Sequence, residues 1–246
     1  MDHPKNKSND TNNEEQEIQI LLENAQLHHR SGNFEKAENM YRSILNKEPE
    51  NSEATHLLGL IALQSGKHSL AQELFQTAIE LNSQNPVIYG NQATNYWMQG
   101  DQKNAEAYYQ KALEIEPTYA EAHANLGKIY MNQQRTEEAW EHLRLAINNG
   151  DKNTDTFATL AKVHFDLGNL EKAELLARNS IQGNPPTNSG YNILIKSLCA
   201  QDRAIEAITV AEEYKEKEPL SSEPRKMLAK AYQDAGMPEL ANLQNN

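Results

Sequence analysis

The sequence has a single cysteine, Cys199, in 246 residues. One thiol cannot form a disulfide within the chain, and it supplies no set of thiolates for a structural metal. The chain also lacks any run of 18 or more apolar residues, and its first seventeen residues are mostly polar. The sequence therefore predicts neither a membrane span nor a secretory signal. We expect a cytoplasmic protein with no membrane partner.

Basic residues are scarce, with 23 Lys and Arg against 35 Asp and Glu, which gives a net charge of −12 at pH 7. Nucleic acids and anionic membranes are bound largely through clustered Lys and Arg. We expect no nucleic-acid partner.

Catalytic and cofactor motifs are missing as well. The eight histidines do not form the pair of His residues with a Glu that a helical zinc-hydrolase site requires. No nucleophile motif surrounds a serine, and single glycines do not make a phosphate-binding loop. The sequence predicts no enzyme, no metal and no cofactor.

What the sequence does contain is a strict period of 34 residues. An alanine recurs at this spacing seven times without a slip, at Ala37, Ala71, Ala105, Ala139, Ala173, Ala207 and Ala241. Thirty-four residues is the length of one helix–turn–helix repeat, in which each unit packs on its neighbours. The sequence predicts one elongated array of helix pairs.

The period divides the chain into six full units and part of a seventh. We expect a flexible polar tail at 1–17, units at 18–51, 52–85, 86–119, 120–153, 154–187 and 188–221, a partial unit from 222, and a C-terminal tail at 242–246. Each full unit has two stretches with helical spacing of apolar residues, here named helix A and helix B. The partial unit has a full helix A and too few residues for a full helix B. It is interpreted as a capping helix that ends the array.

The turn between helices A and B carries a glycine in most units, where a left-handed backbone conformation is expected. Gln134 and Asp202 replace this glycine in the fourth and sixth units, for which we expect a slightly different turn. The recurring alanine lies where helices A and B cross, since a large side chain there would force the pair apart.

In its small, aromatic and alanine positions the frame resembles the tetratricopeptide repeat (TPR), for example in the segment AEAHANLGKIYMNQQRTEEAWEHLRLAI. The resemblance implies an all-α fold, a right-handed superhelical solenoid of about six units plus the capping helix. It also implies a concave groove lined by helix A and a role in binding other proteins. Some members of the family hold an acidic chaperone tail in a carboxylate clamp of Lys, Asn and Arg. The clamp positions here are Leu22, Gln26, Leu57, Val87 and Asn91, so the clamp is absent.

Residues 34 apart on helix A form columns along the expected groove. One column is basic: Lys128, Lys162, Lys196 and Lys230. These lysines favour binding of carboxylates on an extended peptide. The alternative is a solvated helix face inherited when the units duplicated, with exposed pairs such as Lys162 and Asp166.

A second column is apolar: Leu63, Trp97, Met131, Phe165 and Cys199. In the early units Leu57, Leu60 and Met98 extend it. A repeated apolar strip is typical of an interface, and Trp97 is the strongest candidate contact. The alternative is burial against the next helix A. A third pair, Asn91 and Asn125, is similar to the start of the asparagine ladder with which O-linked N-acetylglucosamine transferases grip a peptide backbone.

These columns predict a noncatalytic protein-interaction scaffold whose groove binds a peptide segment with large apolar residues followed by acids. Two alternatives stay open at this point. One is a regulatory or substrate-presenting region of a larger glycosyltransferase or sulfotransferase. The other is self-assembly into a homo-oligomer.

Overall fold

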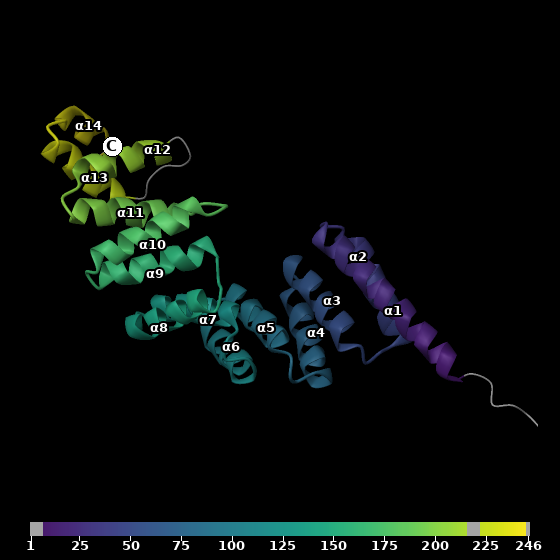
Figure 1. Cartoon of the computed structure of the whole chain (residues 1–246). Coiled ribbons are helices and arrows are strands. Elements are labelled where there is room, and N and C mark those ends of the chain that lie inside the picture. Colours follow the sequence, from purple (N-terminus) through teal and green to yellow (C-terminus); the bar gives the residue numbers. More distant parts are fainter. Residues whose placement is uncertain (1–6, 216–221, 245–246) are drawn as a thin grey trace, which may run out of the picture. The chain divides into compact units, whose positions relative to one another are not determined.

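The computed structural model describes residues 7–215 and 222–244, and over these ranges it contains fourteen α-helices and no strand (Figure 1). It divides into two compact units, Met1–Pro117 (unit 1) and Thr118–Asn246 (unit 2). The sequence predicted a single elongated domain. The division falls within three residues of a repeat boundary, at Pro117, which cannot continue the preceding helix. None of the described helices has the length and apolar content needed to span a bilayer.

Unit 1 consists of three helix pairs. Its helices are α1 (Lys7–Arg30), α2 (Phe34–Lys47), α3 (Ser52–Gln64), α4 (His68–Leu81), α5 (Pro86–Met98) and α6 (Gln102–Ile115). Within each pair the odd-numbered helix is helix A and the even-numbered one is helix B. The described part of unit 1 therefore has the predicted repeat of antiparallel hairpins.

Unit 2 continues the pattern with four pairs. Its helices are α7 (Ala120–Asn132), α8 (Thr136–Asn148), α9 (Thr154–Asp166), α10 (Leu170–Gln182), α11 (Asn188–Ala200), α12 (Ala204–Lys215), α13 (Ser222–Asp234) and α14 (Pro238–Gln244). Each helix A from α3 onward begins at the first residue of a predicted frame unit. The prediction of an all-α repeat fold is confirmed.

Four of the helices A start after a side chain that caps them, whereas α7 starts after Tyr119, which makes no cap hydrogen bond. The Asn51 side chain accepts a hydrogen bond from the backbone N–H of Ala54, and Thr187 accepts one from Gly190. Asn85 and Asn153, at the same frame position, also cap their helices. These oxygens satisfy N–H groups that have no partner within the helix.

Residues 7–17, predicted as part of a flexible tail, belong instead to α1. Glu17 forms an ion pair of 2.8 Å with Lys47 of α2, and Ile18 is buried. Adding a turn to an existing helix costs far less than starting one, because the nucleus is already formed. At the other end, residues 242–244, predicted as tail, lie in α14, while residues 1–6 and 245–246 lie outside the described ranges.

The recurring alanines pack where the two helices of a pair meet. All seven are fully buried. Two helix A glycines show how closely the helices approach. A Cβ atom on Gly127 would lie 2.5 Å from Leu143 Cγ, and one on Gly59 would lie 2.8 Å from the Phe75 ring. Only a hydrogen fits at these two positions, which fixes the spacing of α3 on α4 and of α7 on α8.

The turns between helices A and B are left-handed in every unit, including the two that lack glycine. Gln134 has φ 61° and Asp202 has φ 58°, close to the 70° of Gly66. The expectation of a different turn is therefore wrong. The next residue in each case is an arginine: Arg135 binds Glu138, and Arg203 binds Glu206 at 2.6 Å. Arg135 also donates to the Gln133 side chain at 2.8 Å, and this contact spans a turn whose left-handed conformation a residue with a side chain adopts at a cost.

Candidate functional site

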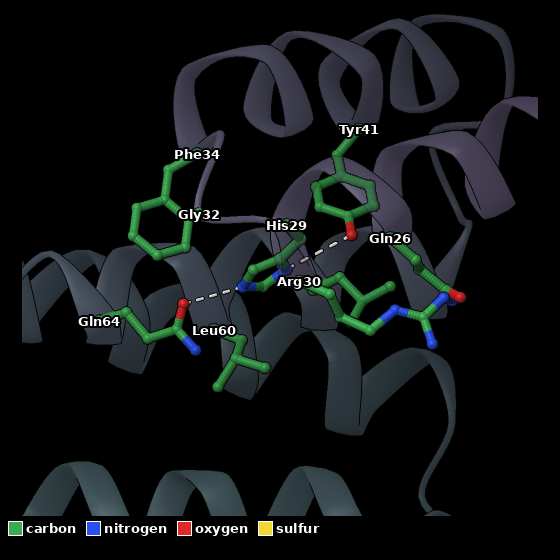
Figure 2. A pocket seen from close by; sticks show the side chains of 9 residues that line it. Gln26, His29, Arg30, Gly32, Phe34, Tyr41, Leu60 and Gln64 are labelled. Carbon is green, nitrogen blue, oxygen red and sulfur yellow. Dashed lines mark hydrogen bonds between the residues drawn. The ribbon is translucent and has the colours of Figure 1, made fainter.

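A hollow of about 460 Å³ opens to solvent in unit 1, between α1, α2 and α3 (Figure 2). Its lining combines apolar and polar side chains from two helices A and one helix B: Gln26, His29, Arg30, Gly32, Phe34, Tyr41, Leu57, Leu60 and Gln64. The volume is in the range of pockets that bind ligands, roughly 300–1,000 Å³.

A fixed histidine forms the floor of this hollow. His29 Nε2 donates to the Gln64 side-chain oxygen at 2.9 Å, and the Tyr41 hydroxyl lies 3.4 Å from Nδ1. The Phe34 ring meets the imidazole edge-on, with 5.6 Å between ring centroids. Burial, with the nearby charge of Glu53, raises the pKa of Tyr41 to about 12, so the phenol stays protonated and can donate. The floor is held in place by bonds within the protein.

The apolar wall of the hollow contains two of the residues predicted from the columns. Leu57 and Leu60 of α3 are half-buried, with part of each side chain still accessible. Phe34, at the start of α2, is 37% exposed. Leu63, by contrast, is only 5% exposed and packs in the core between α3, α4 and α5. The structure thus places Leu63 away from any open surface.

Helix α5 carries the other predicted residues of unit 1. Trp97 is half-buried and Met98 is 57% exposed. The Asn91 amide donates to His56 Nε2 at 2.7 Å. Burial lowers the pKa of His56 to about 4, so the imidazole is neutral at pH 7, and Nε2 accepts in the tautomer that carries its proton on Nδ1. One amide hydrogen of Asn91 is therefore used inside the protein instead of facing a peptide backbone.

The lysine column lies entirely in unit 2, and its members have different surroundings. Lys162 forms an ion pair of 2.6 Å with Asp166, and the Lys196 ammonium lies 4.8 Å from the centroid of the Phe165 ring. Lys128 and Lys230 make no ion pair or hydrogen bond with the residues that the structure describes. The column is thus partly neutralised within the protein, and two of its cations are accessible for an external anion.

The apolar column in unit 2 turns largely toward the core. Phe165 and Cys199 are half-buried and pack against the cluster that joins α9, α11 and α13. Met131 and Asn125 are half-buried on α7. Large apolar side chains are therefore more accessible in unit 1, at Leu60 and Met98, than at the column positions of unit 2.

The columns read from the sequence missed most of the residues that line the hollow, both polar and apolar. The columns were taken along helix A alone, whereas Phe34 belongs to helix B. His29 and Gln64 stand at neighbouring frame positions of successive helices A, so a comparison across two columns was the signal that pairs them.

No group of three or more His, Cys, Asp or Glu side chains suited to a metal occurs among the described residues. The nearest arrangement is His123 with His142, whose Nδ1 atoms lie 3.0 Å apart. A structural zinc ion takes four ligands, so this pair falls short of such a site.

Comparison with known proteins places the chain among repeat proteins. Human tetratricopeptide repeat protein 6 is 25% identical over 122 residues, which cover 50% of this chain and 23% of that protein. The TPR repeat-containing thioredoxin TTL4 of Arabidopsis thaliana is 29% identical over 96 residues, which cover 39% of this chain and 14% of that protein. The chain spans less than a quarter of the length of either relative.

Solved structures show the same fold. PilF of Pseudomonas aeruginosa aligns with a TM-score of 0.77 at 16% identity, covering 90% of this chain and 97% of that one. YrrB, described as a TPR protein with an unusual peptide-binding site, aligns with a TM-score of 0.63 at 23% identity, covering 70% and 89%. At these identities the likeness establishes the fold alone.

A family model covers almost the whole chain. The model described as the cilia and flagella-associated protein 70 C-terminal domain, a TPR domain, matches residues 3–233. Together with the confirmed 34-residue helix pairs, this match shows that the chain belongs to that family of tetratricopeptide-repeat proteins.

Proposed function

We propose that this chain is a noncatalytic scaffold that binds a peptide segment of a partner protein on the helix A side of unit 1. The observation that carries the proposal is the open hollow between α1, α2 and α3. TPR arrays act in general as protein-interaction surfaces, and catalytic motifs are lacking in the sequence.

The energetic basis is apolar burial. Leu60 and Phe34 present carbon surface to solvent, and a partner side chain that enters the hollow would remove that surface from water. Burying one large apolar side chain contributes about 1.5–3 kcal/mol. Trp97 and Met98 on α5 supply further apolar contact within the same unit, and tryptophan is enriched among residues that dominate binding energy.

Carboxylates of the partner are the second element of the proposal. Lys128 and Lys230 in unit 2 are the column lysines best able to bind them, because neither is engaged by a described residue. Exposed pairs of this kind contribute at most about 1 kcal/mol each, so the lysines of unit 2 are a weaker and separate contact for an acidic segment.

Selection from a displayed library of random dodecapeptides tests the proposal while the partner protein is still unidentified. The baits are the wild type, Leu60→Glu in the hollow, and Leu70→Glu as the matched control on α4, where Leu70 is 37% exposed and outside the hollow lining. Circular dichroism melting establishes that each bait is folded. We expect the wild type and Leu70→Glu to enrich the same peptides and Leu60→Glu to lose them. Equal enrichment by all three folded baits would show that the hollow is not the binding surface.

A regulatory region of a glycosyltransferase is a second candidate. It is supported by similarity to human protein O-mannosyl-transferase TMTC3, 28% identical over 133 residues that cover 48% of this chain and 14% of that protein. Its test is whether the selected peptides carry a sugar after incubation with the native protein and a sugar donor. Unmodified peptides would favour the simple scaffold.

A further inference from the structure

One arginine of unit 1 differs from most others in the chain. The sequence has seven arginines, and five of them pair with a glutamate on the same helix or turn: Arg42 with Glu38, Arg135 with Glu138, Arg144 with Glu141, Arg178 with Glu174, and Arg203 with Glu206. Arg30 is exposed, lines the hollow, and makes no ion pair with any residue that the structure describes. Its charge is therefore available to a ligand.

The acidic group close to this edge is already engaged by another side chain. Gln26, one helical turn before Arg30, donates its amide to Glu53 Oε1 at 2.8 Å. Figure 2 shows the Arg30 side chain extending toward Gln26, on the opposite side of His29 from Phe34. The lining of the hollow thus combines the apolar side chains of Phe34 and Leu60 with the guanidinium of Arg30.

We propose that the segment bound in this hollow combines a large apolar residue, which enters beside Phe34 and Leu60, with an Asp or Glu close to it in sequence, which pairs with Arg30. This inference rests on the proposed function and specifies its partner. The guanidinium has a planar set of donors that matches a carboxylate in two parallel hydrogen bonds. Next to an apolar contact that excludes water, such a pair selects for the acid more strongly than a fully exposed pair does.

Glu53 sets the strength of this preference. Its negative charge on the neighbouring helix opposes an incoming carboxylate, while its Oε1 accepts the hydrogen bond from Gln26. Replacing Glu53 by Gln keeps an acceptor for Gln26 and removes the charge. We expect this change to strengthen the selection for acidic residues.

The test is a charge reversal read out in the sequences of selected peptides. The random dodecapeptide library is selected on the wild type, Arg30→Glu, Arg42→Glu and Leu60→Glu. Arg42 lies on α2 of the same unit and pairs with Glu38, so Arg42→Glu changes the net charge by the same amount away from the hollow. We expect the wild type and Arg42→Glu to enrich an aromatic residue or leucine with a nearby acid. Arg30→Glu should keep the apolar residue and exchange the acid for Lys or Arg.

The affinities of one synthesised peptide give a second readout. Fluorescence anisotropy of a wild-type-selected peptide should show a roughly fivefold loss with Arg30→Glu and little change with Arg42→Glu. If Arg30→Glu selects the same acids as the wild type, the role of Arg30 is refuted while the scaffold function stands. If Leu60→Glu also selects the same peptides, the hollow is not the site and the proposed function itself fails.

Discussion

The two units place different chemistry at the same frame position of helix A. In unit 1 this position holds Gln26, Leu60 and Thr94, and in unit 2 it holds Lys128, Lys162, Lys196 and Lys230. The buried alanines of the same frame do not change between the units. Packing between helices fixes the small residues, whereas this position of helix A is half-buried or exposed in both units and accepts Gln, Leu, Thr or Lys. The comparison teaches that the repeat specifies the fold and leaves the binding chemistry to each unit.

The polar contacts between neighbouring helices also differ. Unit 1 joins successive helices A through neutral groups, as in His29 with Gln64 and Asn91 with His56, and it has the ion pair of Glu17 with Lys47 between α1 and α2. Unit 2 uses charged groups, as in Glu174 of α10 with Arg203 before α12. Neutral bonds to a buried imidazole are sensitive to protons, and exposed ion pairs are sensitive to salt. The units should therefore respond to different perturbations.

The largest effect on the free energy of unfolding is expected from adding one methyl group where helices A and B of one pair cross, once in each unit. Gly127→Ala places a Cβ against Leu143, including its backbone nitrogen at 3.3 Å, and should cost about 2–3 kcal/mol. Gly59→Ala meets the edge of the Phe75 ring, which can tilt, and should cost about 1–2 kcal/mol. Urea unfolding with hydrogen exchange assigns each loss to its unit. A smaller loss for Gly127→Ala than for Gly59→Ala would contradict the packing argument.

Acid should weaken unit 1 through His56. Its pKa of about 4 in the folded protein lies below the ordinary value of 6.5, so the unfolded chain binds this proton more tightly. The stabilisation is complete above pH 6.5 and is lost as the pH falls toward 4. Between pH 7 and pH 5 it should fall by about 2 kcal/mol.

Hydrogen exchange of α3 at the two pH values measures this loss of stability. The His56→Gln variant is the control, because it removes the titrating group. An equally steep pH dependence in both proteins would assign the effect to other residues.

The smallest expected effect is on binding of an acidic peptide by the lysines of unit 2, and it should leave binding in the hollow unchanged. A Lys128→Glu, Lys230→Glu double variant should bind a hexaglutamate probe roughly threefold to fivefold more weakly and bind a hollow-selected peptide with unchanged affinity. Anisotropy titrations at low salt and at about 0.5 M salt measure both, and the difference in probe binding should shrink at the higher salt. Unchanged probe binding at low salt would identify the lysines as solvated surface.

Much of this fold was predictable because the same buried alanine recurs every 34 residues, seven times along the chain. The start of helix A and the burial of Ala37 and its equivalents followed from the period alone. The helix over residues 7–17 did not, because its support is a contact between Glu17 and Lys47 that the local sequence does not reveal. Neither did the left-handed turn at Gln134, which depends on its position after helix A more than on its residue type.

The candidate site was predictable only in part. Leu57 and Leu60 were found because columns along helix A identify positions on one face. The burial of Leu63 and the ion pair of Lys162 depend on how far helices approach and which side chains meet, which spacing does not determine. Arg30 was missed because its significance lies in the absence of a described partner, a property of the folded protein.

The bonds that hold His29 between Gln64 and Tyr41 have a consequence for recognition. In the binding that we propose, the protein side of the contact is already ordered at His29, so most of the entropy lost on association belongs to the incoming segment. Segments of equal composition should then be ranked by how well they are ordered beforehand, with constrained peptides dissociating more slowly than flexible ones. Structure formed elsewhere in a partner chain would then raise or lower the affinity of its segment, with no change in this protein.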